Sequence, residues 1–256
     1  MSDLEIEQFM CRSDNFGVLV HDPETGLTAA IDAPEGQPIL DVLARRGWTL
    51  SHVFLTHHHA DHTAGLPALQ DKFQPRLIGP RLSMDKVPGI DLPVSEGNVI
   101  EWSGRDINVL ETPGHTLDHV VYWFSDDGVV FAGDTLFALG CGRVFEGDHA
   151  MMWESLEKLG ALPDATRLYC GHEYTLANAR FALSVDPGNA QLKQRAEEVA
   201  RLRRDDLPTL PSTIGLERQT NPFLRASEPD LKQALGMERA SAESVFAHLR
   251  KAKDNA

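Results

Sequence analysis

The sequence has few cysteines and no long apolar run. Its three cysteines are an odd number, so they cannot form a complete set of internal disulfides. No uninterrupted apolar stretch approaches the roughly 20 residues that a transmembrane helix needs. The first ten residues, "MSDLEIEQFM", are acidic where an export signal has positive charge followed by an apolar core. We therefore expect a water-soluble cytoplasmic protein with reduced thiols.

Positive charge is also scarce. The chain has 24 Lys and Arg residues against 38 Asp and Glu residues, which gives a formal net charge of −14. Nucleic acids and anionic membranes attract basic surfaces, so this balance predicts neither partner. An anionic small molecule would need a local group of cations in order to bind.

Two textures follow one another along the chain. Up to residue 170, short β-rich runs dominate between Gly, Pro and Asp residues, and helical spacing occurs at residues 39–46, 65–73 and 151–159. Beyond residue 173, helical patterns take over at residues 176–185, 189–204 and 241–253. The order predicts an α+β protein in which helices cover sheets, followed by a smaller α-helical region.

The segment "FLTHHHADHTAG" places four histidines and one aspartate in six positions, directly after a predicted strand. In extended backbone, side chains two residues apart leave the same face, so His57 and His59 can converge on one ion while His58 points away. Asp61 and His62 follow on the turn and could bind a second ion. A solvated polar loop is the alternative, but it has no reason to gather so many metal-binding residue types.

Three more candidate ligands follow other predicted strands, each beside a glycine. The motifs "TPGHT", "FAGDT" and "YCGHE" contain His115, Asp134 and His172. Glycine permits tight turns and a close approach of the backbone. Each motif alone is typical of an ordinary turn, but together with the histidine segment they predict a metal centre.

These motifs, in this order, resemble the metallo-β-lactamase superfamily. Within it, "DNFGVLVHDPETG", "GCGRVFEG", "GHEYTLANARFAL" and "NPFLR" resemble the glyoxalase II, or hydroxyacylglutathione hydrolase, family. The resemblance covers nearly the whole chain. It implies a catalytic αββα sandwich at residues 1–172 and an α-helical substrate-binding domain at residues 173–256.

The resemblance also implies two divalent ions per chain. Zinc is the expected metal, and iron and manganese are alternatives for a site of imidazole and carboxylate ligands. Asp134 would bridge the two ions. The remaining ligands would be His57, His59 and His115 for one ion, and Asp61, His62 and His172 for the other. Asp32 and His119 are expected either to orient ligands or to hold turns.

The implied reaction is hydrolysis of S-D-lactoylglutathione to glutathione and D-lactate, the second step of methylglyoxal detoxification. A water shared by two cations can have its pKa lowered from 15.7 to roughly 7, which supplies hydroxide at neutral pH. The leaving thiolate belongs to a thiol of pKa about 8.5 and needs no general acid. No catalytic side chain is therefore expected beyond the metal-bound hydroxide.

The family pattern further implies basic contacts to the glutathione carboxylates at Arg143 and Arg225. The planar guanidinium can donate two parallel hydrogen bonds to a carboxylate. Phe145 and Tyr174 would line the groove between the domains. We expect a monomer whose partner is this small-molecule thioester.

Three other functions compete with the hydrolase. A glutathione persulfide dioxygenase with a single iron has the same fold, but it would not need all seven ligands. A β-lactamase is disfavoured by the acidic N-terminus. A binding or structural protein that has kept the fold would tolerate the loss of ligands, and none is missing here.

Overall fold

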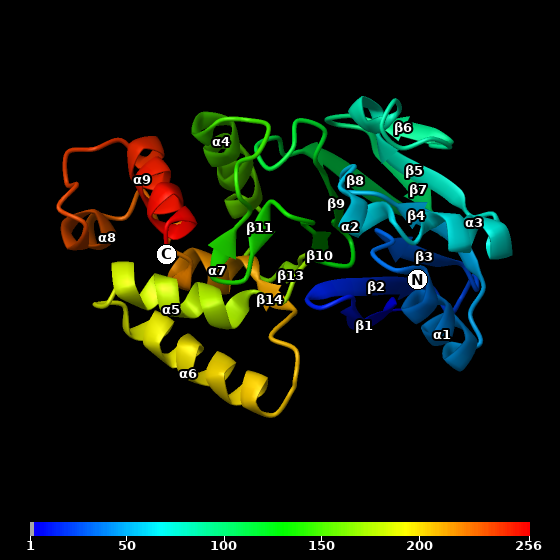
Figure 1. Ribbon diagram of the computed structural model, residues 1–256, viewed down its shortest axis with the longest axis horizontal. Coiled ribbons are helices and arrows are strands. Elements are labelled where there is room, and N and C mark those ends of the chain that lie inside the picture. The colour runs from blue at the N-terminus through cyan, green and yellow to red at the C-terminus, as the bar shows by residue number, and fades with distance from the viewer. Residues whose placement is uncertain (1–2) are drawn as a thin grey trace. The chain divides into compact units, whose positions relative to one another are not determined.

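The structure, a computed structural model, describes residues 3–256 (Figure 1). The chain divides into two compact units. The first contains the chain up to Glu111 together with Asp118–Gly133, and the second contains Thr112–Leu117 together with Asp134–Ala256. This division does not follow the expected boundary at residue 172, which stays a prediction. Within the described residues, no helix combines the length and the apolar character that crossing a membrane requires.

The first unit contains a six-stranded sheet in the order β1-β2-β3-β4-β5-β6. Strands β1 to β3 pair antiparallel, and β3 to β6 pair parallel. Parallel neighbours need a crossover, and α1 (Gly36–Arg46) and α3 (Leu66–Phe73) supply two of them. The strands are β1 (Glu5–Cys11), β2 (Asn15–His21), β3 (Thr28–Ile31), β4 (Leu50–Phe54), β5 (Arg76–Pro80) and β6 (Leu92–Val94).

Four further strands of this unit pair antiparallel in the order β7-β8-β9-β10. They are β7 (Val99–Trp102), β8 (Arg105–Glu111), β9 (Val120–Phe124) and β10 (Val129–Phe131). Short helical turns, α2 (Ala60–Thr63) and η1 (Arg81–Ser83), follow β4 and β5. The unit therefore contains two groups of strands with helical connections, as the pattern of short apolar runs predicts.

The core of the first unit lies on both faces of β4. Phe54 is fully buried, and its ring meets those of Trp102, Tyr122 and Phe124 edge to face at centroid distances of 5.2–6.3 Å. On the other face, α1 and α3 bury their apolar sides against the first sheet through Ile39, Val42, Leu43, Leu66 and Leu69. These two helices confirm the helical patterns at residues 39–46 and 65–73.

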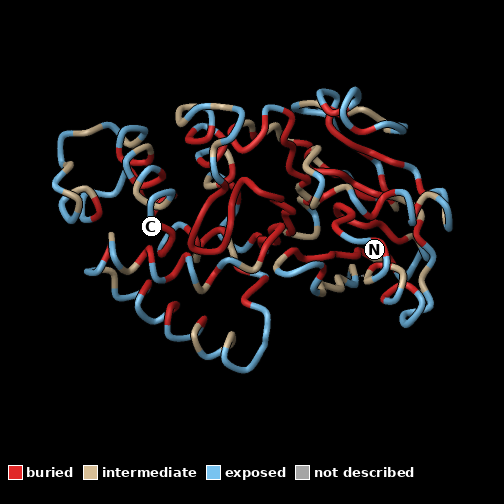
Figure 2. The backbone as a smooth tube through the Cα atoms, viewed as in Figure 1, coloured by how far each residue is buried: buried red, intermediate tan, exposed pale blue. Residues whose placement is uncertain are grey.

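The second unit is mainly helical. Its helices are α4 (His149–Gly160), α5 (Thr175–Val185), α6 (Ala190–Arg204), α7 (Ile214–Thr220), α8 (Pro229–Ala234) and α9 (Ala242–Asp254). Side chains at the N-caps fix where several of them begin: Asn189 accepts a hydrogen bond from the Leu192 amide, and Ser241 accepts one from the Ser244 amide. Buried and exposed residues alternate along α6 (Figure 2), as expected for an amphipathic helix.

Two short strand pairs complete this unit. Strands β11 (Leu136–Phe137) and β12 (Gly140–Cys141) form a hairpin, and β13 (Arg167–Tyr169) pairs antiparallel with β14 (Ser212–Thr213). Helices α4, α5, α6 and α9 confirm the four helical patterns predicted for this part of the chain. The hairpin follows Asp134 directly, so its placement determines where that carboxylate lies.

Phe54→Ala should lower the free energy of unfolding by about 3–5 kcal/mol, because it removes a fully buried ring that three aromatic neighbours contact. Denaturant titration followed by circular dichroism measures the loss. Leu82→Ala is the control, since that side chain is 61% exposed and its removal should change stability by about 0.5 kcal/mol at most. Equal losses in the two variants would contradict this description of the core.

Candidate metal centre

The histidine segment lies in the loop between β4 and α2. His57 and His59 precede the helix, and Asp61 and His62 lie on it. The ring of His57 is 4.7 Å from that of His59 and 4.2 Å from that of His62, measured between centroids. Asp61 Oδ2 lies 3.8 Å from His62 Nε2. The loop thus brings together the four residues that the spacing selected.

Asp32 and Thr56 hold two of these imidazoles by their Nδ1 atoms. The Asp32 carboxylate accepts hydrogen bonds from the amide and hydroxyl of Thr56 at 2.7 and 2.8 Å, and it contacts His62 Nδ1 at 2.8 Å. The Thr56 hydroxyl lies 3.0 Å from His57 Nδ1. Histidines that bind a metal through one nitrogen commonly donate the other to an oxygen in this way. Asp32 thus contacts a candidate ligand, and its role in orienting that ligand stays a prediction.

His119 packs against the same loop. Its ring stacks on His57 with centroids 4.9 Å apart. Gly133, which precedes Asp134, has a φ of +48°, and a Cβ atom there would lie 2.6 Å from His119 Nε2 and 2.8 Å from the Thr56 hydroxyl. Only glycine fits this close approach, which explains the glycine of "FAGDT".

His58 has different partners from its two neighbours. Its Nδ1 lies 2.8 and 2.9 Å from the two carboxylate oxygens of Asp118, which also accepts a hydrogen bond from the Ser83 hydroxyl. The Lys86 ammonium is 3.4 Å from the same ring nitrogen. The alternation expected along extended backbone thus separates the environment of His58 from those of His57 and His59.

In the second unit, two candidate histidine ligands meet at the carboxylate of a third candidate ligand, Asp134. Asp134 Oδ2 lies 3.4 Å from His115 Nε2 and 3.3 Å from His172 Nε2, and all three residues are buried. The other nitrogen of His115 is 2.9 Å from the carbonyl oxygen of Arg143. The two histidines therefore present the same ring atom to the carboxylate that the motifs single out.

Gly142 makes this approach possible. Its amide donates to the Thr135 carbonyl at 3.1 Å. A Cβ atom at Gly142 would lie 1.9 Å from the Asp134 carbonyl oxygen and 3.3 Å from His115 Nδ1. No other residue fits there unless the chain that carries Asp134 moves.

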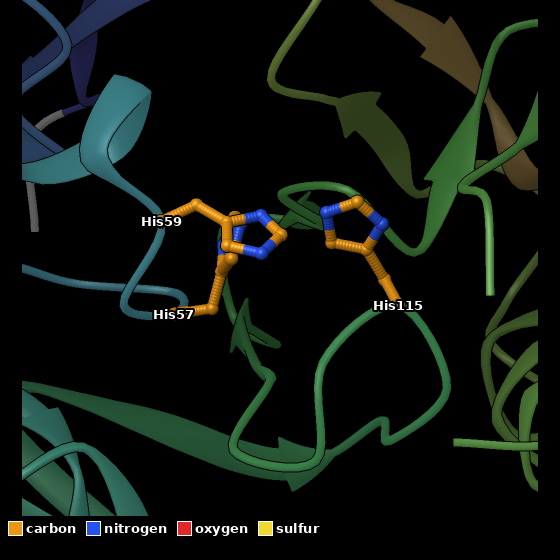
Figure 3. A group of neighbouring side chains, drawn as sticks. All are labelled: His57, His59 and His115. Carbon is orange, nitrogen blue, oxygen red and sulfur yellow. The ribbon is translucent and has the colours of Figure 1, made fainter. Parts of the chain in front are cut away.

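Among the described residues, four groups of three offer ligand atoms within 4.8 Å of one another: His57, His59 and His115; His57, His62 and Asp134; Asp61, His62 and His172; and His58, Asp118 and Glu146. Figure 3 draws the side chains of the first group. The first three groups contain all seven residues predicted as ligands. Imidazole nitrogens and carboxylate oxygens suit zinc, iron and manganese, so the donor set fits a divalent transition metal.

Three predicted substrate contacts lie beside ligands in the second unit. The ring of Tyr174 stacks on His172 with centroids 4.7 Å apart and an interplanar angle of 6°. Phe145 is 60% exposed, and its ring is 5.2 Å from that of His115. The side chain of Arg143 is 66% exposed. An exposed cation and two partly exposed rings are thus available next to the candidate ligands.

Arg225, the fourth predicted contact, is buried in the helical part of this unit. Its Nε donates to Asp186 at 3.1 Å, and its Nη2 donates to Asp230 at 2.7 Å. A contact between Arg225 and glutathione would require the guanidinium to be shared with these carboxylates. That contact stays a prediction.

The structure groups two other cations with Arg143, and sequence reasoning missed both. Asp254 Oδ1 lies 2.8 Å from Arg250 Nη2 and 4.0 Å from Arg143 Nε. Burial, followed by the positive charges of Arg250 and Arg143, lowers the pKa of Lys253. The smaller contributions of Arg250 and Arg143 place two positive charges near the Lys253 ammonium, and a group of cations of this kind attracts carboxylates. The signal in the sequence was "HLRKAKD", whose basic residues look like ordinary helix-end charges.

The three cysteines offer no nucleophile. All are buried and free of disulfides. Burial is the largest effect on each thiol: it raises the pKa of Cys141 to about 11 and that of Cys11 to about 12, and it also raises the pKa of Cys170. The thiols stay protonated at neutral pH.

Comparisons with known proteins identify the family of the chain. Residues 17–172 match the model of the metallo-beta-lactamase superfamily, and residues 173–256 match that of the hydroxyacylglutathione hydrolase C-terminus. A hydroxyacylglutathione hydrolase of Rhizobium johnstonii is 55% identical over 255 residues, which is 100% of both chains. One of Mesorhizobium japonicum is 57% identical over 252 residues, covering 98% of this chain and 99% of that protein.

The fold is similar to solved structures as well. The crystal structure of ETHE1 from Myxococcus xanthus aligns with a TM-score of 0.68 at 26% identity and covers 96% of this chain and 90% of that one. These matches confirm the predicted metallo-β-lactamase fold and the helical C-terminal part. With full-length relatives at more than half identity and models that match both parts, the chain belongs to the hydroxyacylglutathione hydrolase, or glyoxalase II, family of the metallo-β-lactamase superfamily.

Proposed function

We propose that this protein hydrolyses S-D-lactoylglutathione to glutathione and D-lactate. The observation that carries the proposal is the convergence of His115 and His172 on the Asp134 carboxylate, beside the exposed Arg143. The activity named for the full-length relatives supports the substrate class. A small anionic thioester also agrees with the cations grouped around Asp254.

Two divalent ions per chain would be held by the seven predicted ligands. The first would lie among His57, His59 and His115, the second among Asp61, His62 and His172, and Asp134 would contact both. The groups of ligand atoms within 4.8 Å support this assignment. We propose zinc, with iron and manganese as alternatives that the same donors accept. When bound, such ions polarise a carbonyl and lower the pKa of water to roughly 7.

The side chains around the ligands determine the geometry of the centre. Asp32, Thr56 and the Arg143 carbonyl hold His62, His57 and His115 by Nδ1, so that each ring presents Nε2 toward its ligand position. The partners of Nδ1 thus fix both the tautomer and the orientation of these rings.

Other residues would bind and shield the substrate. Phe145 and Tyr174 lie with their rings against His115 and His172, where they would pack on the substrate and shield it from water. Arg143 and Lys253 would bind the glutathione carboxylates. The leaving thiolate accepts its proton from solvent, so no side chain needs to act as a general acid.

We keep the boundary between the catalytic and substrate-binding domains at residue 172, supported by the two family models that meet there. A monomer in the cytoplasm stays our expectation, and the three cysteines without disulfides fit a reducing compartment.

The purified protein should release thiol from S-D-lactoylglutathione, and exhaustive chelation should abolish this activity. Adding back zinc or manganese should restore it, because the nucleophile forms only with metal present. Thiol release and metal content are measured on the same sample. Activity that survives chelation would contradict the metal assignment, and one iron per chain with oxygen uptake would indicate the dioxygenase instead.

Asp134→Ala should remove metal from both positions, since this carboxylate lies beside ligands assigned to each ion. Elemental analysis of purified variants measures the ions per chain. His58→Ala is the control, because His58 contacts Asp118 and has no assigned ligand role. If the two variants lose metal equally, Asp134 does not bridge the ions.

Arg143→Ala should raise KM about tenfold, the loss of about 1.4 kcal/mol that one charge-assisted contact supplies, and should change kcat little. Arg218→Ala is a matched control, since Arg218 is also exposed and pairs with an acidic side chain, Asp164. Steady-state kinetics at low salt measures both constants. An unchanged KM in Arg143→Ala would remove this residue from the substrate site.

Arg225→Ala distinguishes the two roles open to that residue. If Arg225 binds glutathione, KM rises by a similar factor to that in Arg143→Ala. If the residue only pairs with Asp186 and Asp230, the free energy of unfolding falls while KM stays at the parental value.

A further inference from the structure

The hairpin β11–β12 connects two parts of the candidate metal centre. Asp134 lies two residues before β11, and Arg143 lies two residues after β12. The Arg143 carbonyl holds His115 Nδ1 at 2.9 Å. The position of this hairpin, residues 136–141, therefore determines where the bridging carboxylate lies and how the His115 ring is oriented.

Side chains from the helices that follow hold the hairpin at five successive residues. Asn221, at the C-terminus of α7, donates to the Phe137 carbonyl at 3.1 Å and to the Gly140 carbonyl at 2.9 Å. Glu217 on α7 accepts from the Leu139 amide at 2.7 Å. The other two bonds are from Asn178 on α5 to the Ala138 carbonyl at 3.1 Å and from Arg250 on α9 to the Cys141 carbonyl at 2.9 Å.

Asn221 and Glu217 are the centre of this arrangement. Both are fully buried, and Asn221 also donates to Glu217 at 3.1 Å. Leu139 lies on the hairpin between the two residues that Asn221 contacts, Phe137 and Gly140. Its φ of +58° is a left-handed conformation, which costs free energy for a residue with a side chain. Such a turn persists only where its surroundings hold it, and the bond from its amide to Glu217 does so.

The hairpin transmits its position to the ligands through its two ends. The Gly142 amide donates to the Thr135 carbonyl, and the backbone at Gly142 approaches the Asp134 carbonyl too closely for any Cβ atom. A shift of the hairpin therefore moves Asp134, and through the Arg143 carbonyl it also turns His115.

We propose that Asn221 and Glu217 are positioning residues for the metal centre, which they build by fixing the β11–β12 hairpin. This role rests on the proposed function, since it takes Asp134 and His115 as metal ligands. It also gives the asparagine of "NPFLR" a function that is distinct from substrate binding.

Asn221→Asp tests the proposal. The variant keeps the shape of the side chain and an acceptor for the Phe223 amide, but it loses both hydrogen bonds to the hairpin. Competition of the metal-free protein against a chelator should show zinc binding about 10–100-fold weaker than in the parent. Amide hydrogen exchange of residues 136–143 in the metal-free protein should also become faster.

Thr220→Val is the matched control. Thr220 is the neighbour of Asn221 and is fully buried. The substitution removes its hydrogen bond to the Leu216 carbonyl, and that bond does not involve the hairpin. Zinc affinity and hairpin exchange should stay parental in this variant. Glu217→Gln keeps the shape of the side chain and one acceptor for the Leu139 amide. Its loss of zinc affinity should therefore be smaller than that of Asn221→Asp. This variant serves as the test if Asn221→Asp does not fold.

Parental zinc affinity and parental exchange in Asn221→Asp would overturn the proposal, and so would equal losses in Thr220→Val. If Asn221→Asp does not fold, parental affinity and exchange in Glu217→Gln overturn it. A parent protein that binds no divalent ion contradicts the proposed function instead. Even then, exchange in the metal-free variants reports whether Asn221 and Glu217 hold the hairpin, so the two failures are distinguishable.

Discussion

The structure depends on one buried carboxylate. Asp134 lies in the interior with the Nε2 atoms of His115 and His172 at 3.4 and 3.3 Å. Burying a carboxylate is costly unless positive charge or a metal compensates it. A divalent ion held by the same nitrogens and oxygen would supply compensating charge. The cost of burial is therefore the physical reason for the donor set around it.

Keeping that carboxylate in place requires backbone geometry that few residue types tolerate. Gly133 has a positive φ, Gly142 lies against the Asp134 carbonyl, and Leu139 is left-handed. Strand pairing alone does not hold the backbone at these three residues, because β11 and β12 have two residues each. The helical part of the chain supplies the holding contacts through Asn221 and Glu217. By the role proposed for these two residues, the helical part would contribute to the metal centre as well as to substrate binding.

The sequence predicted what depends on local spacing. Helices α1, α3, α5, α6 and α9 follow from the periodicity of their apolar residues, and the ligands from residue types clustered at strand ends. It could not predict which arginines stay exposed. The sequence does not distinguish Arg225 from Arg143. In the structure, Arg225 is buried and donates a hydrogen bond to Asp186, which lies 39 residues away along the chain. Asn221 and Glu217 were missed for the same reason, because their partners are 78 to 84 residues away along the chain.

The acidic chain and its anionic substrate are compatible because electrostatic potentials are local. At physiological ionic strength, exposed charges are screened over about 8 Å, so most of the net charge of −14 has little effect at the substrate site. At the proposed substrate site, the nearby charges are the cations Arg143, Arg250 and Lys253 and the carboxylate of Asp254. Arg250 is held by the Cys141 carbonyl and Asp254, whereas the Arg143 side chain extends into solvent. The positive charge of Arg250 is thus held in one place, whereas that of Arg143 is exposed to ligands in solvent.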